Sequence, residues 1–198
     1  MPRLLDYAER LFVLLLAIPF VVAFAATMSA HPSFIAVTVS ELLGVAFILT
    51  RRRGEMTLTP YAFSVAILGT ALPLLVRPYG GVQLAPQLAT SILMVGGLAV
   101  SISAKIFLNR SFGMVAANRG IKRGGPYRLV RHPMYFGYIT TQIGFLLASF
   151  SIINLGLYCV AWVFQILRIR EEEKLLMADP AYAELAQSVP RRLIPGVY

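Results

Sequence analysis

Long stretches without a charged side chain are the feature that most limits how this chain can fold. With a single acidic interruption, they cover residues 11–30, 33–50, 56–76, 86–104 and 132–167. A helix rises about 1.5 Å per residue, so about 20 residues match the roughly 30 Å hydrocarbon core of a bilayer. Soluble domains carry about 25% charged residues, whereas this chain carries 14%. The sequence therefore predicts an all-α protein, a polytopic bundle of about five membrane spans.

The fifth stretch is too long for one straight span. Its 36 residues would form a helix of roughly 54 Å at about 1.5 Å per residue, well beyond the thickness of the hydrocarbon core. Polar residues suited to a turn lie near its middle, at Ser149, Ser151 and Asn154. We therefore expect a tight helical hairpin, with both of its feet at the same membrane surface.

Charge placement predicts the orientation of the bundle. The 18 Lys and Arg residues exceed the 9 Asp and Glu residues, which gives a net charge of +9. If the N-terminus is cytoplasmic, every basic residue except Arg77 falls on the cytoplasmic side, as the positive-inside rule requires. We therefore expect an integral, multi-pass membrane protein with both termini in the cytoplasm. Topology and anionic lipid explain the basic charge better than nucleic-acid binding does, and no obligate protein partner is evident.

The chain divides by character into two parts. Residues 1–104 are apolar helices joined by minimal loops, whereas residues 105–198 combine a basic loop, the membrane hairpin and a polar C-terminal tail. In this tail, Asp179 is suited to cap a short helix that begins at Pro180. The single cysteine, Cys159, allows no internal disulfide and is expected to be buried. No glycine-rich nucleotide-binding motif or metal-ligand pattern occurs, so no metal is expected.

The most informative short segment precedes the hairpin and spans residues 124–138. Because His132 comes before Pro133, its backbone is biased away from the helix, which should start after it. This places an imidazole at a helix N-terminus, where backbone N–H groups favour anions. Together with nearby arginines and with Tyr127 and Tyr135, it would suit a ligand with a carboxylate and a flat heterocycle. The alternative is an aromatic and basic belt that only anchors the helix in the membrane interface.

A second charged cluster begins where the hairpin ends, with Arg168 and the three consecutive glutamates at residues 171–173. Arg168 and Glu172 are four residues apart and share one helix face, so they form either an ordinary ion pair or part of a binding site. An anionic substrate group would suit Arg168, and an ammonium or a ribose hydroxyl would suit Glu172. Glu41, alone within an apolar stretch, either lines a substrate cavity or is a packed, hydrogen-bonded residue.

These segments resemble the isoprenylcysteine carboxyl methyltransferase and phospholipid methyltransferase superfamily. The resemblance rests on residues 125–137, Gly-Pro-Tyr-Arg-Leu-Val-Arg-His-Pro-Met-Tyr-Phe-Gly, and on the tail from Arg168 to Pro195. It covers about the last ninety residues, whereas the preceding ones agree only in being membrane helices. The tail departs from the family pattern at residues 178–182, Ala-Asp-Pro-Ala-Tyr, where a Phe-Gly pair before the Tyr is common.

The resemblance implies S-adenosylmethionine as methyl donor, bound in a pocket at the cytosolic face between the hairpin and the tail. It makes residues 105–198 the catalytic region. The implied cofactor contacts are Tyr127, His132, Pro133, Met134, Tyr135, Glu172 and the segment Arg119, Gly120, Ile121 and Lys122. Arg168 would contact the substrate. Arg168 and Glu172 are the implied catalytic residues, with Glu171 as a further candidate.

The expected function is therefore methyl transfer from S-adenosylmethionine to a hydrophobic or lipid-like acceptor, which enters from the bilayer and offers a carboxylate, an amine or a thiol. One alternative is an NADPH-dependent membrane reductase of the sterol or steroid type, whose C-terminal pattern is similar. Another is a small transporter or lipid-binding module in which Glu41 is the functional charge. Transport would require polar groups at the midplane of several helices, and Glu41 is the only charged one.

Overall fold

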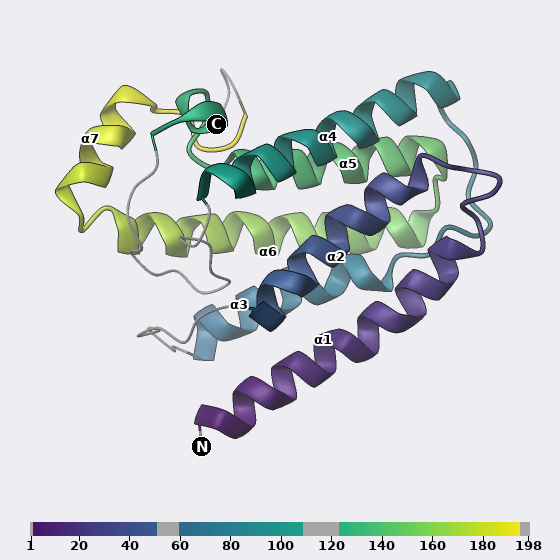
Figure 1. The fold of residues 1–198 in the computed structure, drawn as a ribbon, viewed down its shortest axis with the longest axis horizontal. Helices are drawn as coiled ribbons and strands as arrows, with labels where there is room; N and C mark the ends of the chain where they lie inside the picture. The colour runs from purple at the N-terminus through teal and green to yellow at the C-terminus, as the bar shows by residue number, and fades with distance from the viewer. Residues whose placement is uncertain (1, 51–59, 109–122, 195–198) are drawn as a thin grey trace.

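The computed structural model describes residues 2–50, 60–108 and 123–194. These residues form helices joined by turns, without a strand (Figure 1). The α-helices are α1 (Pro2–Ala25), α2 (Phe34–Thr50), α3 (Pro60–Ala71), α4 (Gln87–Leu108), α5 (Pro133–Ala148), α6 (Ile152–Leu176) and α7 (Pro180–Ser188). Two short 3₁₀ helices, η1 (Leu72–Leu75) and η3 (Gly125–Arg128), accompany them. The all-α prediction is confirmed for this part of the chain.

Successive helices run back and forth, so their connections gather at two opposite ends of the molecule. The turns between α1 and α2, between η1 and α4, and between α5 and α6 lie at one end, and η3 and α7 lie at the other (Figure 1). At the first end, the Val82 N–H donates to the Phe150 carbonyl, and the Ser149 hydroxyl donates to the Pro78 carbonyl. These bonds join the turn before α4 to the turn after α5. We call the opposite end, formed by residues 123–132 and 168–194, the polar end.

The helical hairpin predicted for residues 132–167 is confirmed. α5 begins at Pro133, and His132 before it has φ −123° and ψ 57°, outside the helical region. The helix ends at Ala148 and α6 starts at Ile152, so the chain turns at the predicted serines. Asn154 fixes this turn to the chain before α4: its side chain accepts from the Arg77 N–H at 3.2 Å and donates to the Arg77 carbonyl at 2.7 Å.

Small residues allow α4 and α5 to make the most extensive contact of any two described elements. Gly97 of α4 faces Gly137 and Thr141 of α5, and a Cβ added to Gly97 would lie 2.6 Å from the Gly137 carbonyl oxygen. The Thr141 hydroxyl also donates across the interface to the Met94 carbonyl at 3.3 Å. α4 therefore holds α5, whose first turn carries three of the predicted site residues, in one position.

The outward faces of the longer helices are apolar. Large exposed hydrophobic side chains include Leu11, Leu15, Ile18 and Val22 on α1, Leu88, Ile92 and Val95 on α4, and Ile152, Ile153 and Val163 on α6. Within the described ranges, α4 and α6 are long and apolar enough to cross a membrane, and shorter apolar helices cover Arg10–Ala25, Phe34–Ala46 and Ser64–Leu75. This pattern is consistent with a membrane protein, while the number of spans stays a prediction.

The expectation that Cys159 is buried is wrong. Its side chain is exposed, because it lies on the face of α6 that also exposes Ile152, Val160 and Val163. In a bundle whose outer surface is apolar, an apolar neighbourhood in the sequence does not indicate burial.

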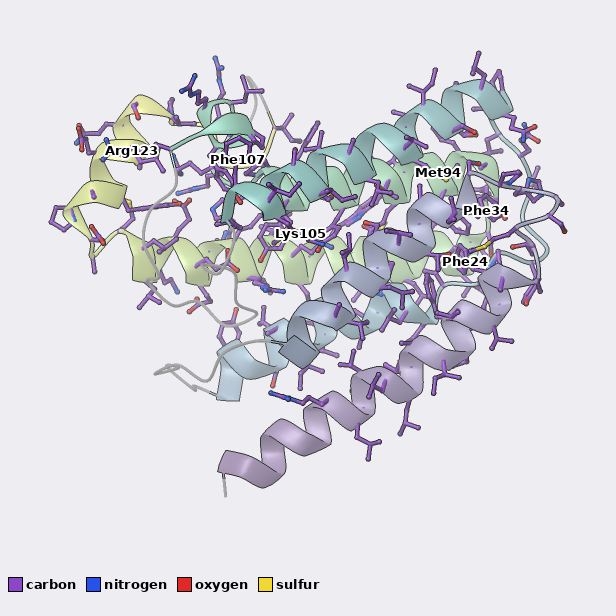
Figure 2. All side chains as sticks on the ribbon, viewed as in Figure 1. Phe24, Phe34, Met94, Lys105, Phe107 and Arg123 are labelled. Carbon is purple, nitrogen blue, oxygen red and sulfur yellow. The ribbon has the colours of Figure 1, made fainter. Side chains whose placement is uncertain are left out.

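Aromatic side chains fill the core at the end away from α7. Phe24, Phe34 and Phe145 are almost completely buried, and their ring centroids lie 5.9, 5.3 and 5.2 Å apart in pairs, within the range of favourable aromatic contacts. Figure 2 shows Phe24 and Phe34 at this end and Arg123 near α7. This aromatic part of the core thus lies away from the polar end, where the predicted site residues gather (Figure 2).

Candidate functional site

The tail holds the chain before α5 through backbone hydrogen bonds. The Arg131 and His132 N–H groups donate to the carbonyls of Arg191 and Arg192, at 3.0 and 2.8 Å. Gly125 at the start of η3 has φ +57°, and Phe107 of α4 covers it so closely that a Cβ would clash with the phenyl ring. Both the backbone conformation and the available space therefore require glycine there. These contacts fix the position of His132 relative to the tail and to α4.

Glu173 lies at the centre of a buried group that we call the Glu173 cluster: Arg131, His132, Glu173 and Tyr182. Arg131 donates to both carboxylate oxygens, from Nε to Oε1 and from Nη2 to Oε2, each at 2.9 Å. His132 Nε2 lies 2.8 Å from Oε1, and the Tyr182 hydroxyl donates to the same oxygen at 2.7 Å. The side chains of Arg131, His132 and Glu173 are only 5, 6 and 8% exposed. The cluster therefore joins the chain before α5, the end of α6 and α7 in a site shielded from solvent.

α7 is held by its own cap and by this cluster. The Asp179 side chain accepts from the Ala181 N–H at 2.9 Å, so the predicted cap is confirmed. Burial, together with the hydrogen bond to Glu173, raises the pKa of the Tyr182 phenol. The phenol therefore stays protonated and remains a donor to the carboxylate. On the outer side, Arg123 pairs with Glu184 of α7.

Glu172 faces a different group, which we call the Glu172 cluster: Tyr135, Arg168 and Glu172. The Tyr135 hydroxyl donates to Glu172 Oε1 at 2.6 Å, and Arg168 Nε donates to the same oxygen at 3.2 Å. The Arg168 guanidinium lies 5.5 Å from the centroid of the Tyr135 ring, within the range of a cation–π contact. Because the Arg168 and Glu172 side chains are only 12% and 17% exposed, this pair is more shielded than an ordinary surface ion pair.

His132 belongs to the Glu173 cluster and also approaches the Glu172 cluster. Its Nε2 contacts Glu173, and its Nδ1 lies 3.7 Å from Glu172 Oε2. The imidazole centroid is 5.9 Å from that of Tyr135. The imidazole thus connects the carboxylate that holds the tail with the carboxylate that faces Tyr135 and Arg168.

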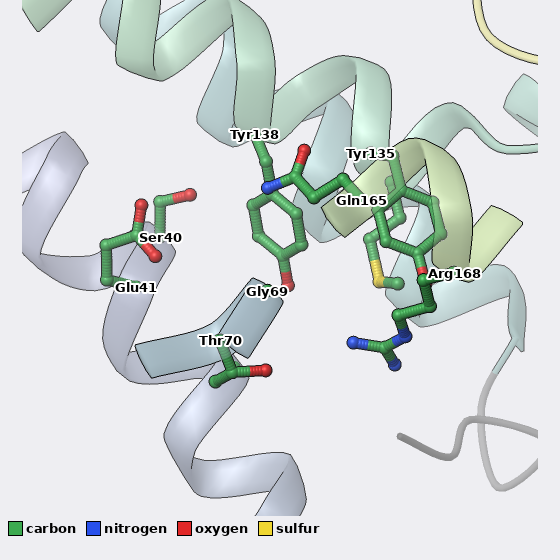
Figure 3. Close-up of a pocket in the computed structure, with 10 residues that line it drawn as sticks. Ser40, Glu41, Gly69, Thr70, Tyr135, Tyr138, Gln165 and Arg168 are labelled. Carbon is green, nitrogen blue, oxygen red and sulfur yellow. The ribbon is translucent and has the colours of Figure 1, made fainter. Parts of the chain in front are cut away.

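A pocket lies beside the Glu172 cluster, among α2, α3, α5 and α6 (Figure 3). Its lining residues are Ser40, Glu41, Gly44, Gly69, Thr70, Met134, Tyr135, Tyr138, Gln165 and Arg168. Figure 3 shows Ser40 and Glu41 on one side of this space and Tyr135, Tyr138 and Arg168 on the other. Glu41 Oε1 accepts from the Gln142 amide at 2.9 Å, and the Gln142 carbonyl accepts from the Trp162 indole at 2.7 Å. Glu41 therefore lines a cavity and is also hydrogen-bonded, while the role of the cavity as a substrate site stays a prediction.

The structure brings together four of the predicted site residues, namely His132, Tyr135, Arg168 and Glu172. Pro133 and Met134 form the first turn of α5 with Tyr135, and Met134 lines the pocket.

Tyr127 packs in a buried apolar group with Met134 and Tyr135, and its burial and the nearby Glu172 carboxylate raise the pKa of its phenol. Glu171 pairs instead with Lys174 at 2.6 Å, so it belongs to neither cluster. Arg119, Gly120, Ile121 and Lys122 lie outside the described residues.

Sequence reasoning assigns no role to Glu173, although it holds the larger cluster. Three consecutive glutamates look alike in a sequence, and only the register of the helix separates them. That register is visible in α6, where Ala161, Gln165, Ile169 and Glu173 recur every four residues and are all buried. Extending this buried face past the charge-free stretch would have identified Glu173 as the inward glutamate.

The described residues form a helical bundle whose longer helices suit a membrane and whose two glutamate clusters lie at one end. Residues 96–178 match the model of the isoprenylcysteine carboxyl methyltransferase family. The matched region contains α5, α6 and every member of the two clusters except Tyr182, and it supports membership of that family. No curated protein matches the chain.

Proposed function

We propose that the protein transfers a methyl group from S-adenosylmethionine to a hydrophobic or lipid-like acceptor at a membrane surface. The observation that carries this proposal is the hydrogen bond between Tyr135 and Glu172. It joins the motif at the start of α5 to the motif at the end of α6, and both lie within the matched residues 96–178. Two motifs that lie far apart in the sequence are thus in contact, as they must be if both bind the same ligand.

The residues at this meeting point suit the chemical groups of S-adenosylmethionine. This donor carries a carboxylate, an ammonium group, a ribose and a flat purine beside its sulfonium. The largely shielded Glu172 carboxylate can accept from the ammonium group or a ribose hydroxyl, and Tyr127 and Tyr135 present aromatic rings. Glu172 accepts from Tyr135 and Arg168 in the structure, so a bound cofactor would share or replace these hydrogen bonds.

The cofactor would supply an electrophilic methyl group, whose bond to sulfur breaks as the bond to the acceptor oxygen, nitrogen or sulfur forms, so that a neutral thioether leaves. The protein would align the two reactants and exclude water, and such positioning can supply much of the acceleration. Arg168, which lines the pocket, would hold an anionic group of the acceptor next to Tyr135. A carboxylate acceptor needs no base, whereas an amine or thiol would give its proton to Glu172 or to water.

The same proposal places the polar end at the cytoplasmic surface, with both termini in the cytoplasm and about five spans including the hairpin. Basic residues support this orientation, because Arg123, Arg128 and Arg131 belong to the polar end, while Arg77 belongs to the turn between η1 and α4 at the other end (Figure 1). Such an asymmetry matches the positive-inside rule. The acceptor would then reach the pocket from the bilayer.

Thermal unfolding of the purified protein in detergent tests the proposed function. We expect S-adenosylhomocysteine to raise the Tm, because a ligand that binds only the folded state stabilises it by about 2.7 kcal/mol at a hundredfold excess over its Kd. NADPH should leave the Tm unchanged. Protection by NADPH without protection by S-adenosylhomocysteine would indicate a reductase instead, and protection by neither would favour a transporter or a lipid-binding module.

A further inference from the structure

The pocket beside the Glu172 cluster extends from the polar end toward the middle of the helix bundle. Tyr135 and Glu41 both line it. Glu41 is hydrogen-bonded to Gln142, which follows Tyr135 by seven residues in α5. At about 1.5 Å per residue, Glu41 therefore lies on the order of 10 Å deeper in the bundle than Tyr135. A ligand that fills the pocket therefore has one end near Tyr135 at the polar end and the other end near Glu41, toward the middle of the helix bundle.

The pocket wall carries polar atoms that the described residues do not satisfy. Ser40 Oγ and Gln165 Oε1 have no hydrogen-bond partner among these residues, although Ser40 is fully buried and Gln165 is 5% exposed. Leaving buried polar atoms unpaired is unfavourable, so their presence in a cavity wall indicates a ligand that pairs with them. Glu41 lines the same wall, and its Oε1 accepts from Gln142. Gln165 Oε1 and the Glu41 carboxylate accept hydrogen bonds, and the Ser40 hydroxyl can accept as well as donate, so a donor on the ligand can pair with each of them.

We infer that this pocket binds the acceptor, and that Glu41 recognises a hydroxyl or amino group within the acceptor's hydrocarbon chain. The inference rests on the proposed function, which sets the reacting head of the acceptor at Arg168. The donor group then lies on the order of 10 Å from the head. Each bond of an extended chain advances by about 1.2 Å, so this distance corresponds to about eight bonds. The substrate class is an amphiphile with a polar substituent in its chain, rather than a plain saturated lipid.

Selectivity follows from the position of Glu41 inside an apolar bundle. When a plain hydrocarbon chain fills the pocket, the buried Ser40 Oγ and Gln165 Oε1 stay unpaired, and the half-buried Glu41 loses access to water. A site that hydrogen-bonds a substrate hydroxyl rejects an analogue without it strongly, because the site's own polar groups are then left unpaired. Glu41 thus acts as a specificity residue, whereas Arg168 and Glu172 stay next to the reacting atoms.

The test compares four long-chain acids as ligands of the full-length protein in detergent, saturated with S-adenosylhomocysteine. They are octadecanoic acid and its 2-hydroxy, 10-hydroxy and 18-hydroxy derivatives, and thermal shift at increasing concentration gives the apparent affinity of each. We expect the 10-hydroxy acid to bind about tenfold more tightly than octadecanoic acid. Glu41→Ala should abolish this preference, and Glu41→Gln, which keeps an acceptor oxygen, should retain most of it.

Equal binding of all four acids, or a preference that persists in Glu41→Ala, would overturn the inference. If Glu41→Ala does not fold, Gly44→Ala provides a second variant, because Gly44 lines the pocket and a Cβ there meets no atom within 4 Å. It should weaken binding of all four acids without changing the protection by S-adenosylhomocysteine. Failure of S-adenosylhomocysteine to protect any variant, with the 10-hydroxy preference intact, would contradict the proposed methyl transfer but not the lipid pocket.

Discussion

Glu172 and Glu173 are adjacent in the chain, yet their carboxylates face different partners. Glu172 accepts from Tyr135 and Arg168, whereas Glu173 accepts from Arg131 and Tyr182. Consecutive residues of an α-helix, with 3.6 residues per turn, point about 100° apart. One glutamate therefore lies at the proposed reaction site, and its neighbour ties the C-terminal tail to the helix bundle. The two should respond differently to the same substitution.

Glu173→Gln should destabilise the protein strongly. The amide cannot balance the charge of Arg131, which is only 7% exposed, and removing one partner of a buried ion pair typically costs about 3–5 kcal/mol. Thermal unfolding in detergent measures the effect. Glu171→Gln is the matched control, because Glu171 pairs with the exposed Lys174 and its loss should leave the Tm nearly unchanged. Equal Tm values for the two variants would contradict the structural role of Glu173.

Glu172→Gln and Arg168→Ala should separate cofactor binding from acceptor binding. We expect Glu172→Gln to weaken S-adenosylhomocysteine binding by about 1–3 kcal/mol, since it removes a charged hydrogen-bond acceptor. Arg168→Ala should leave this affinity nearly intact and abolish turnover, because Arg168 lines the pocket assigned to the acceptor. Calorimetric titration and a radiolabelled methyl-transfer assay give the two values. The reverse pattern would show that the two roles are exchanged.

Tyr182→Phe should lower stability by an amount that depends on pH. Burial and the Glu173 hydrogen bond raise the pKa of this phenol above its usual 10.0. Above about pH 10 the unfolded chain releases the proton while the folded protein keeps it, so the stabilising contribution is lost as pH rises. The difference in unfolding free energy between wild type and variant should be about 1–2 kcal/mol at pH 7 and should shrink by pH 11. Denaturant titrations at both pH values measure it, and a difference that grows with pH would refute the assignment.

The sequence predicted those parts of the structure that depend on local pattern. Charge-free stretches and the His132-Pro133 step located the hairpin, and the spacing of Arg168 and Glu172 placed them on one helix face. The hydrogen bond between Glu41 and Gln142 could not be predicted in this way, because the two residues lie 101 positions apart. The periodicity of a sequence shows which face of a helix is apolar, but it does not show that α5 packs against α2. The roles of Arg131 and Tyr182 depend likewise on the return of the tail to the start of α5.

Gly97→Ala should destabilise the contact between α4 and α5, whereas Gly96→Ala should not. A Cβ on Gly97 would lie 2.6 Å from both the Gly137 carbonyl oxygen and the Thr141 nitrogen, and one on Gly96 would meet nothing within 4 Å. Overpacking of this kind typically costs about 1–3 kcal/mol, while alanine in place of an open helical glycine gains about 0.5–1 kcal/mol. The Tm values of the two variants should therefore move in opposite directions. A similar Tm for both would indicate that the α4–α5 interface is looser than described.

Cysteine labelling in intact membrane vesicles tests the proposed orientation. The background is Cys159→Ser, because Cys159 is exposed and would otherwise react. Single cysteines at Gln83 and Ser188 suit this test, since both positions are exposed. Gln83 belongs to the turn before α4 and Ser188 ends α7, and these two elements lie at opposite ends of the molecule (Figure 1). With the polar end in the cytoplasm, a membrane-impermeant maleimide added outside should label Gln83→Cys at once and Ser188→Cys only after permeabilisation.

Labelling in the opposite order would show that the orientation is the reverse of the one proposed and would leave the helix arrangement intact. Labelling of both positions from the same side would contradict the arrangement itself, because residues at opposite ends of a membrane-spanning bundle cannot share one aqueous face.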